Sequence, residues 1–203
     1  MYKVLNLYAG IGGNRKYWTD CEVTAVEYNS DIASVYQKLY PDDTVIVSDA
    51  HEYLRVNYDK FDFIWSSPPC QSHSRMMKAT RHRLDRYPDM TLYQQIIYLQ
   101  NFYKGKWVVE NVNPYYTPLI EPYKRVGRHL FWSNFEFECE DVKRPANFIN
   151  NTNKQGRLQL QEWLGIKFDE VLYYEGNHCP AQVLRNAVHP EIGQAIYDAA
   201  RTG

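Results

Sequence analysis

One cysteine in this sequence stands where a nucleophile could be held in place. Cys70 follows Ser67-Pro68-Pro69 and precedes Gln71, and the two prolines restrict the backbone that carries the thiol. A cysteine attacks as its thiolate, and positive charge nearby lowers the pKa of a thiol. A basic segment follows, residues 73–86, with His73, Arg75, Lys78, Arg81, His82, Arg83 and Arg86. Most free cysteines are buried and inert, but prolines on one side and basic residues on the other argue against a core position, so Cys70 is the candidate nucleophile.

Three further features could form a site for a nucleoside cofactor. The turn Gly10-Ile11-Gly12-Gly13 follows a predicted strand, and its glycines let the backbone approach a ligand closely. A helix expected from about Asn14 would favour an anionic group at its N-terminus. The next two strands end at Glu27, which could bind the hydroxyls of a ribose, and at Asp49, which could accept a hydrogen bond from an adenine amino group. Each feature alone could equally be a turn or a helix cap, but together they indicate a nucleoside cofactor.

Short apolar runs alternate with helical patterns in the first half of the sequence. Strands are predicted at residues 4–8, 23–27, 44–47, 61–65 and 107–109, and helices from about residue 14, over 31–39 and over 92–102. This alternation predicts an α/β fold with a doubly wound, mostly parallel sheet. Ligands bind at the carboxyl ends of the strands in such sheets, and the candidate residues all follow predicted strands.

The pattern weakens after residue 130. Residues 130–137 could form one or two strands, 140–157 are polar and loop-like, and helices are expected over 158–164, before Gly165, and over 192–200. We therefore divide the chain into three parts. These are a catalytic unit, residues 1–136, a small irregular insertion, residues 137–180, and a C-terminal segment that returns to the first unit, residues 181–203.

Composition and charge narrow the functional classes. The net charge is −1, with 44% hydrophobic and 23% charged residues, so this is an ordinary globular composition. Contact with a nucleic acid would depend on local basic patches, such as residues 73–86 and 124–129. No apolar run approaches membrane-spanning length, and no signal peptide is recognised after Met1, so we expect an intracellular protein that does not enter membranes.

Four cysteines are scattered along the chain without a CxxC pair: Cys21, Cys70, Cys139 and Cys179. This spacing argues against a zinc ribbon and against a disulfide framework. A zinc site that combines His129, His178, Cys139 and Cys179 is disfavoured, because the adjacent His178 and Cys179 cannot easily ligate one ion. We expect no bound metal.

Three segments, in this order, resemble the motifs of the cytosine-5 DNA methyltransferase family. They are Tyr8-Ala9-Gly10-Ile11-Gly12-Gly13, Pro69-Cys70-Gln71 and Glu110-Asn111-Val112. The ordered pair of Pro-Cys-Gln and Glu-Asn-Val is highly specific, and the resemblance covers most of the chain apart from residues 137–180. It implies a small, phage-like member of this family, with the sheet of S-adenosylmethionine-dependent methyltransferases and S-adenosylmethionine as methyl donor.

The resemblance implies a role for each matched residue. In the family the Pro-Cys-Gln cysteine is the nucleophile and the Glu-Asn-Val glutamate contacts the target cytosine, which makes Cys70 and Glu110 catalytic. Arg128 matches an arginine that touches the cytosine carbonyl. The cofactor-binding residues implied are Tyr8, Gly10, Gly12, Gly13, Glu27, Asp49, Pro69, Leu92 and Asn186. The residues expected to contact DNA are Gln71, Arg75, Lys78, Arg81 and Arg83.

The sequence departs from the family pattern at four points. Tyr8 stands where the family usually has Phe. Arg125 and Arg128 are separated by two residues where Gln-x-Arg-x-Arg is usual, which leaves the register of Arg128 open. Arg185 stands where the C-terminal motif usually has Gly. Residues 137–180, in the place of the target-recognition domain, are fewer than usual, so sequence selectivity could be relaxed.

The implied reaction requires an activated cytosine ring. Attack of Cys70 on C6 would place electron density on C5, while a protonated Glu110 donates to N3 and Arg128 holds the carbonyl oxygen. The base must leave the duplex to be reached. We expect a monomer that acts on double-stranded DNA in the cytoplasm of a bacterial or phage-infected cell, as in restriction–modification systems.

Three alternatives stay open on the sequence alone. A related family that modifies transfer RNA shares Pro-Pro-Cys-Gln, so the substrate could be RNA. Exocyclic amino methyltransferases carry Ser-Pro-Pro followed by an aromatic residue, where this chain has Cys70. The third alternative is a non-catalytic DNA-binding module, against which the intact Cys70 and Glu110 argue.

Overall fold

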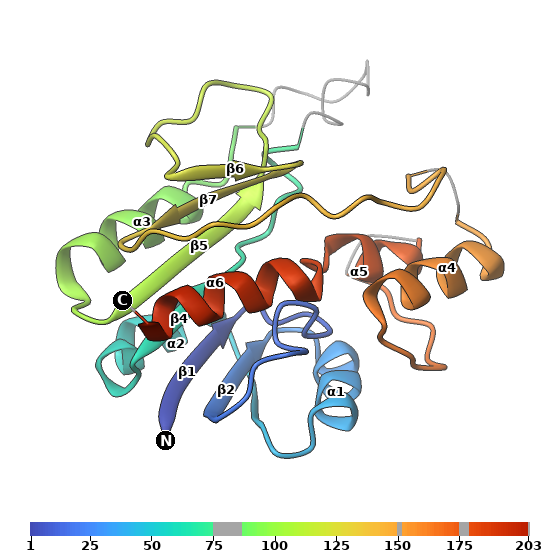
Figure 1. The fold of residues 1–203 in the computed structure, drawn as a ribbon, viewed down its shortest axis with the longest axis horizontal. Coiled ribbons are helices and arrows are strands. Elements are labelled where there is room, and N and C mark those ends of the chain that lie inside the picture. Colours follow the sequence, from blue (N-terminus) through green and yellow to red (C-terminus); the bar gives the residue numbers. More distant parts are fainter. Residues whose placement is uncertain (75–86, 150–151, 175–178, 203) are drawn as a thin grey trace.

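The computed structural model describes residues 1–74, 87–149, 152–174 and 179–202, which contain a seven-stranded sheet (Figure 1). The strands are β1 (Tyr2–Leu7), β2 (Cys21–Glu27), β3 (Thr44–Val47), β4 (Phe63–Ser66), β5 (Lys106–Val112), β6 (Lys124–Val126) and β7 (His129–Ser133). Their order is β3-β2-β1-β4-β5-β7-β6. The first five pair in parallel, and β7 runs antiparallel to β5 and β6. The predicted doubly wound, mostly parallel sheet is confirmed.

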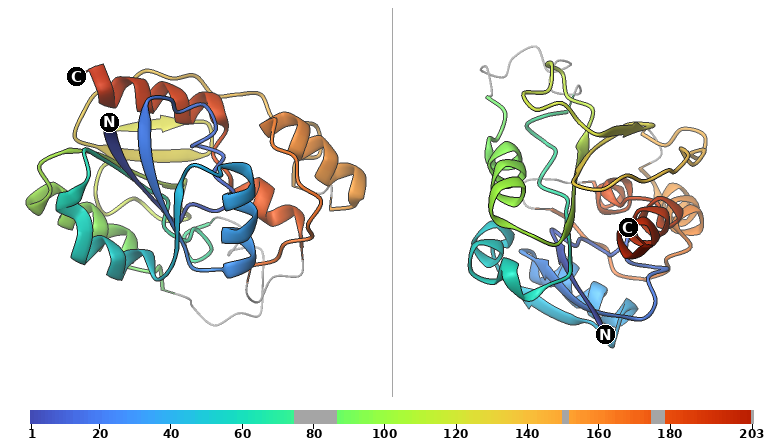
Figure 2. Two further views of the ribbon diagram at one scale, coloured as in Figure 1. Left: turned by 90° about the horizontal axis from the view of Figure 1, so that it is seen from below. Right: turned by 60° about the vertical axis from the view of Figure 1, so that its left-hand side comes forward.

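Helices cover both faces of this sheet. One face carries α2 (Ala50–Asn57) and α3 (Thr91–Phe102), and the opposite face carries α6 (Pro190–Thr202), as both panels of Figure 2 show. The face of α6 also carries α1 (Ser30–Leu39), and α4 (Lys154–Leu164) and α5 (Ala181–Asn186) pack against α1. A short 3₁₀ helix, η1 (Tyr58–Lys60), follows α2.

The central strands are apolar on both faces because helices cover both. In β1, Val4 packs in the cluster that contains α6, whereas Leu5 and Leu7 pack with α2 and α3. All three side chains are completely buried. Successive residues of a strand point to opposite faces, so an unbroken apolar run is what a strand covered on both sides requires.

The helix predicted from about Asn14 is not formed, and this prediction is wrong. Residues 12–18 make successive turns closed by backbone hydrogen bonds between residues three apart. The face where that helix would lie is covered by α6: the Trp18 ring stacks on Tyr197 at 5.2 Å, and Trp18 Nε1 donates to the Gly193 carbonyl at 3.0 Å. This part of the chain therefore offers no helix N-terminus to an anion.

Besides the 3₁₀ helix η1, three elements lie outside the sequence-based prediction: α2, α5 and β6. A signal for α2 is present, because Asp49 is followed three residues later by Glu52, and Asp49 Oδ1 accepts from the Glu52 backbone N at 2.9 Å. The other two elements are too short to show periodicity. The helix predicted before Gly165 is confirmed as α4, and Gly165 ends it in a left-handed conformation with φ of 61°.

Much of the segment 137–180 packs directly on the sheet and its helices. Phe137 belongs to the apolar cluster under α6, and Leu160 and Leu164 of α4 pack with α1 and α5. Among the described helices, none has both the length and the apolar character that crossing a membrane requires.

Gly193 lets α6 lie directly on the turns that follow β1. An added Cβ there would lie 2.6 Å from the Asn14 Cα, and backbone atoms cannot relieve that contact by changing rotamer. We expect Gly193→Ala to lower the free energy of unfolding by about 1–3 kcal/mol in chemical denaturation, although alanine is the better helix former. The control is Asp198→Ala on the exposed side of α6, expected within about 0.5 kcal/mol of wild type. A G193A protein as stable as wild type would contradict this packing.

Candidate active site

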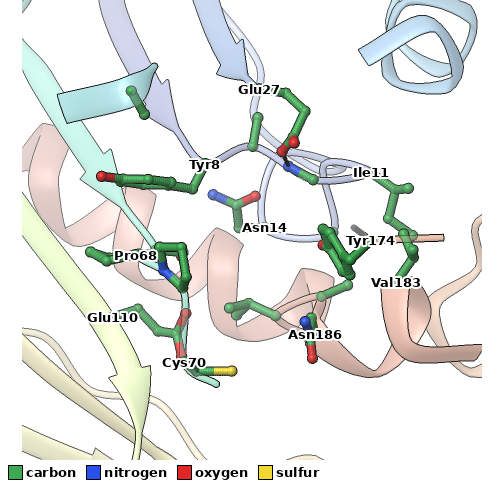
Figure 3. Close-up of a pocket in the computed structure, with 18 of the residues that line it drawn as sticks. Tyr8, Ile11, Asn14, Glu27, Pro68, Cys70, Glu110, Tyr174, Val183 and Asn186 are labelled. Atoms are coloured by element: carbon green, nitrogen blue, oxygen red, sulfur yellow. Dashed lines mark hydrogen bonds between the residues drawn. The ribbon is translucent and has the colours of Figure 1, made fainter. Parts of the chain in front are cut away.

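A cavity of about 580 Å³ opens at the carboxyl ends of the parallel strands. Its walls come from the turn after β1, the ends of β2 and β3, the loop after β4, strand β5 and the residues around α5. Figure 3 shows Glu27 at one end of the cavity, Cys70 and Glu110 at the other, and Tyr174 and Asn186 along one side. Parallel pairing produces this gathering, because it brings the carboxyl ends of the strands to one edge.

Most of the predicted site residues line this cavity. They are Tyr8, Gly10, Gly13, Glu27, Asp49, Pro69, Cys70, Gln71, Glu110, Arg128 and Asn186. Gly12 does not line it: its φ of 72° shapes the turn, and its carbonyl accepts from the Tyr40 hydroxyl at 2.7 Å. Leu92 is 2% exposed and lies in the core beneath α3. Arg75, Lys78, Arg81 and Arg83 lie outside the described residues.

Glu27 forms a fixed corner of the cavity. Its Oε2 accepts from the Gly10 backbone N at 2.9 Å, and its Oε1 accepts from the Asn29 backbone N at 3.0 Å. Burial raises the pKa of the Glu27 carboxyl, and these backbone donors oppose the rise. The last residue of β2 therefore ties the glycine turn to the start of α1 and still presents oxygen lone pairs to a ligand.

The Tyr8 ring is held by a buried hydrogen-bond network. Tyr8 has a φ of 55°, unusual for a residue with a side chain, and its hydroxyl accepts from Gln95 Nε2 at 2.5 Å. Gln95 is completely buried, and its Oε1 accepts from the Ser66 hydroxyl at 2.6 Å. Asp49 is exposed at the cavity rim, where it also caps α2. The network and the cap hold an aromatic wall and an acid at the same end as Glu27.

The Cys70 thiol is half-buried, and its loop is pinned at both sides. Asn111 Nδ2 donates to the Pro68 carbonyl at 2.9 Å, and the His73 backbone N donates to the Cys70 carbonyl at 3.1 Å. Burial and, after it, the charge of Glu110 raise the pKa of the Cys70 thiol to about 11, against the opposing charge of Arg128. The isolated protein therefore holds this residue as the thiol at neutral pH.

Of the basic residues 73–86 expected to lower the pKa of the Cys70 thiol, only His73 lies within the described residues, and it does not act as a cation. His73 is 1% exposed, and burial lowers the pKa of its imidazole. Its Nδ1 lies 2.5 Å from the Tyr116 hydroxyl, so this ring packs as a neutral group. Among the described residues, the cation that acts on the thiol is Arg128, which lies in the turn between β6 and β7.

Arg128 lines the cavity, and its charge acts on Cys70 and Glu110. Its Nη2 donates to the Arg185 carbonyl, and its guanidinium carbon lies 5.4 Å from the centre of the Phe148 ring. Burial lowers the pKa of the guanidinium, and the charges of Glu110 and Cys70 oppose that change. The neighbouring Arg125 is exposed and points away, with its Nε bonded to the Gly127 carbonyl.

Tyr174 and His129 also line the cavity, which the sequence did not predict. Tyr174 comes from the irregular segment and places its hydroxyl beside Gly10. Arg185, which replaces the usual glycine, is buried and fastens the same segment: its Nε donates to the Phe148 carbonyl at 2.9 Å. Segments without periodicity carry no signal of such long-range contacts. Among the described residues, no group of three or more potential ligands could hold a metal ion.

Comparison with known proteins gives one family match and several similar structures. The family model of C-5 cytosine-specific DNA methylases matches residues 2–118. The chain is similar to a triple mutant of DNMT2 from Spodoptera frugiperda, with 27% identity, TM-score 0.40, and coverage of 55% of this chain and 36% of that one. A SAM-dependent methyltransferase of Agrobacterium tumefaciens gives 17% identity, TM-score 0.38, and coverage of 57% and 40%. An Escherichia coli protein described as a prophage DNA modification methyltransferase has 13% identity and a TM-score of 0.45. The match covers 74% of this chain and 54% of that one. Comparison with curated proteins gave no match.

Because the match at residues 2–118 covers more than half of the sequence, the chain belongs to the C-5 cytosine-specific DNA methylase family. The matched range contains the glycine turn, Cys70 and Glu110, and it ends before Arg128. S-adenosylmethionine is the cofactor of this class. The chain spans little more than a third of the DNMT2 protein, at 36% of its length.

The charge of Glu110 should control the ionisation of Cys70. We expect Glu110→Gln to lower the pKa of the Cys70 thiol and to raise its alkylation by iodoacetamide at pH 8.5 roughly 3- to 10-fold. Peptide mapping by mass spectrometry measures each cysteine separately. Cys139, whose thiol pKa is also about 11 but responds to Lys124 and Glu138, is the internal control and should react at an unchanged rate. Equal alkylation of Cys70 in both proteins would show that Glu110 does not influence the thiol.

Proposed function

We propose that this protein transfers the methyl group of S-adenosylmethionine to C5 of cytosine in DNA, with Cys70 as the nucleophile. The observation that carries the proposal is that Cys70, Glu110 and Arg128 meet at one end of a cavity whose other end is built around Glu27. A nucleophile, a proton donor and a cation at one end leave the remaining space for a cofactor.

The Glu27 end fits the cofactor. A volume of about 580 Å³ lies within the usual range of small-molecule sites. In our proposal Glu27 accepts from the ribose hydroxyls, Asp49 accepts from the adenine amino group, and the Tyr8 ring packs against the ligand. Gly10 and Gly13 leave their backbone open to the ligand, while Gly12 and Leu92 support the wall from behind. Pro69 and Asn186 line the same space, and the bound cofactor supplies an electrophilic methyl group on its sulfonium sulfur.

The Cys70 end would activate the cytosine. The Cys70 sulfur bonds to C6, the electron pair of the C5–C6 double bond moves towards C4 and N3, and Glu110 gives a proton to N3. Arg128 donates to the carbonyl oxygen O2. After C5 has acquired its methyl group, water takes the C5 proton, the electron pair of the C5–H bond restores the C5–C6 double bond, and the C6–S bond breaks. The N3 proton returns to Glu110, and Cys70, whose thiol proton went to solvent on attack, takes a proton back from solvent. Both side chains end in their starting states.

Proton transfer from Glu110 and ionisation of Cys70 support each other. The negative charge of Glu110 is one cause of the raised pKa of the Cys70 thiol, and Arg128 opposes it. A Glu110 side chain that holds a proton for N3 carries no such charge. The arrangement that protonates the base therefore also favours the thiolate.

The remaining parts of the proposal concern how the target cytosine reaches the cavity and which residues contact the DNA. A cytosine inside a duplex cannot reach Cys70, so we propose that it is flipped out, at a cost of a few kcal/mol. Gln71 is exposed at the cavity rim, where DNA would approach. We propose that Arg75, Lys78, Arg81 and Arg83 contact phosphates. Residues 137–180 would serve as a short recognition region between the catalytic unit, residues 1–136, and the segment 181–203 of a monomer.

The first test is mass spectrometry of nucleosides from a plasmid grown with the gene. We expect 5-methylcytosine with the wild-type protein and none with Cys70→Ala, because the adduct at C6 cannot form. Cys21→Ala is the matched control and should retain activity, since Cys21 lies at the opposite end of β2 from the cavity. N4-methylcytosine that persists in the C70A protein would instead indicate an exocyclic amino methyltransferase.

The substrate class needs a separate comparison. Duplex DNA and transfer RNA are offered together to the purified protein with radiolabelled S-adenosylmethionine. We expect label in DNA, and label confined to transfer RNA would reverse the substrate assignment. Absence of methylation together with absence of cofactor binding in calorimetry would favour a non-catalytic module.

The cofactor end is tested by binding alone. We expect Glu27→Gln to weaken S-adenosylhomocysteine binding at least about tenfold in calorimetry, because an amide nitrogen cannot accept from Gly10, Asn29 or a ribose hydroxyl. Glu22→Gln, an exposed change on the same strand, is the control and should bind within about twofold of wild type. An unchanged affinity of the E27Q protein would remove Glu27 from the cofactor site.

A further inference from the structure

His129 contacts the carboxyl of Glu110, and the proposed mechanism leaves it unused. His129 Nδ1 lies 2.5 Å from Glu110 Oε1, and the side chains are 9% and 7% exposed. Both residues line the cavity. Glu110 pairs with Phe131 across β5 and β7, so His129, two residues along the same strand face, is its diagonal neighbour. The pairing of two buried strands therefore fixes this contact.

The partners of the imidazole determine the direction of its hydrogen bonds. Arg128 Nε donates to His129 Nε2 at 3.1 Å. A guanidinium has no acceptor, so Nε2 must be the unprotonated nitrogen. The single proton of the neutral ring then lies on Nδ1, which donates to Glu110 Oε1. Arg128, His129 and Glu110 thus form one chain of donors that ends on the carboxyl.

We propose that His129 is the positioning residue that holds Glu110 for proton exchange with N3 of the cytosine. The proposal rests on the function proposed above. With Oε1 bound to His129, the other oxygen, Oε2, is the one that faces the base and carries the exchanged proton. His129 keeps its own proton throughout, so it acts through Glu110 and not on the substrate.

The same contact stabilises the charged intermediate state of Glu110. When Oε2 has given its proton to N3, Glu110 is a carboxylate, and the hydrogen bond from His129 Nδ1 becomes charge-assisted. A donor aimed at charge that develops during the reaction lowers the barrier without needing to move. Hydrogen bonds to anions are stronger than those to neutral carboxyl groups. The His129 bond therefore stabilises the ionised Glu110 of the intermediate more than the neutral Glu110 of the substrate complex. This predicts an effect on kcat with little effect on KM.

Two substitutions separate a hydrogen-bond donor from a packing residue. His129→Phe keeps a planar ring and removes the donor, and His129→Asn keeps an N–H near the position of Nδ1. We expect H129F to lower kcat for cytosine methylation at least about 100-fold, with KM for S-adenosylmethionine and DNA within about threefold of wild type. H129N should recover activity to within about tenfold of wild type. The matched control is His189→Asn, an equally buried histidine, 7% exposed, whose Nε2 bonds to the Trp163 carbonyl.

A second measurement reports only on the addition of Cys70 to the cytosine ring. Exchange of the C5 hydrogen of cytosine with water, measured without S-adenosylmethionine on DNA tritiated at C5, requires Cys70 addition and N3 protonation but no methyl transfer. We expect H129F to slow this exchange as strongly as it slows methylation. Wild-type protein that shows neither exchange nor 5-methylcytosine would overturn the proposed function, before any His129 variant is compared.

The outcomes for His129 itself are distinct. A wild-type kcat in H129F would overturn the proposal. So would an H129F loss that comes with equal losses of cofactor affinity and melting temperature, because that pattern belongs to a structural role. An H129N protein as inactive as H129F would also overturn it, since the retained donor would then have no value.

Discussion

The parallel pairing of β1 with β4 is the constraint on which the site depends. Leu7 pairs with Ser66, and the Ser67 backbone N donates to the Leu7 carbonyl at 3.3 Å. The segments that follow β1 and β4 therefore leave the sheet side by side. β1 then turns through the glycine segment and β4 runs into the prolines before Cys70. β2 pairs with β1 on its other side and delivers Glu27 to the same edge. The cavity is the space between these three strand ends.

Charge in this confined space has to balance. Cys70, Glu110 and Arg128 influence one another because burial weakens screening by water. If Cys70 and Glu110 were both ionised, two negative charges would lie near one guanidinium. If Glu110 is protonated, only the thiolate charge remains to be balanced by Arg128. Burial first, and the charge of Glu110 second, raise the pKa of the Cys70 thiol. In the proposed reaction the second arrangement, with Glu110 protonated, is used, so protonation of the base and ionisation of the nucleophile would be linked.

Segments late in the sequence complete what the first half begins. α6 covers the face of the sheet where a helix after β1 would otherwise lie, with Trp18 stacked on Tyr197. Tyr174 brings the irregular segment to the cavity wall, and Arg185 bonds that segment to α5. Tyr174 and the residues around α5 lie after position 118, where the matched family range ends. They form one side of the cavity.

The sequence alone determined the sheet, the order of its motifs and most of the cavity residues, because strand periodicity and motif spacing are local properties. It could not determine which loops meet. The helix expected near Asn14 is not formed, since α6 packs on the turns after β1, and the described cation that acts on Cys70 is Arg128, far from it in the sequence. His129 was considered as part of a basic patch and as a metal ligand, and it contacts Glu110. Such contacts join residues far apart in the chain, and packing and burial decide them only when the whole fold has formed.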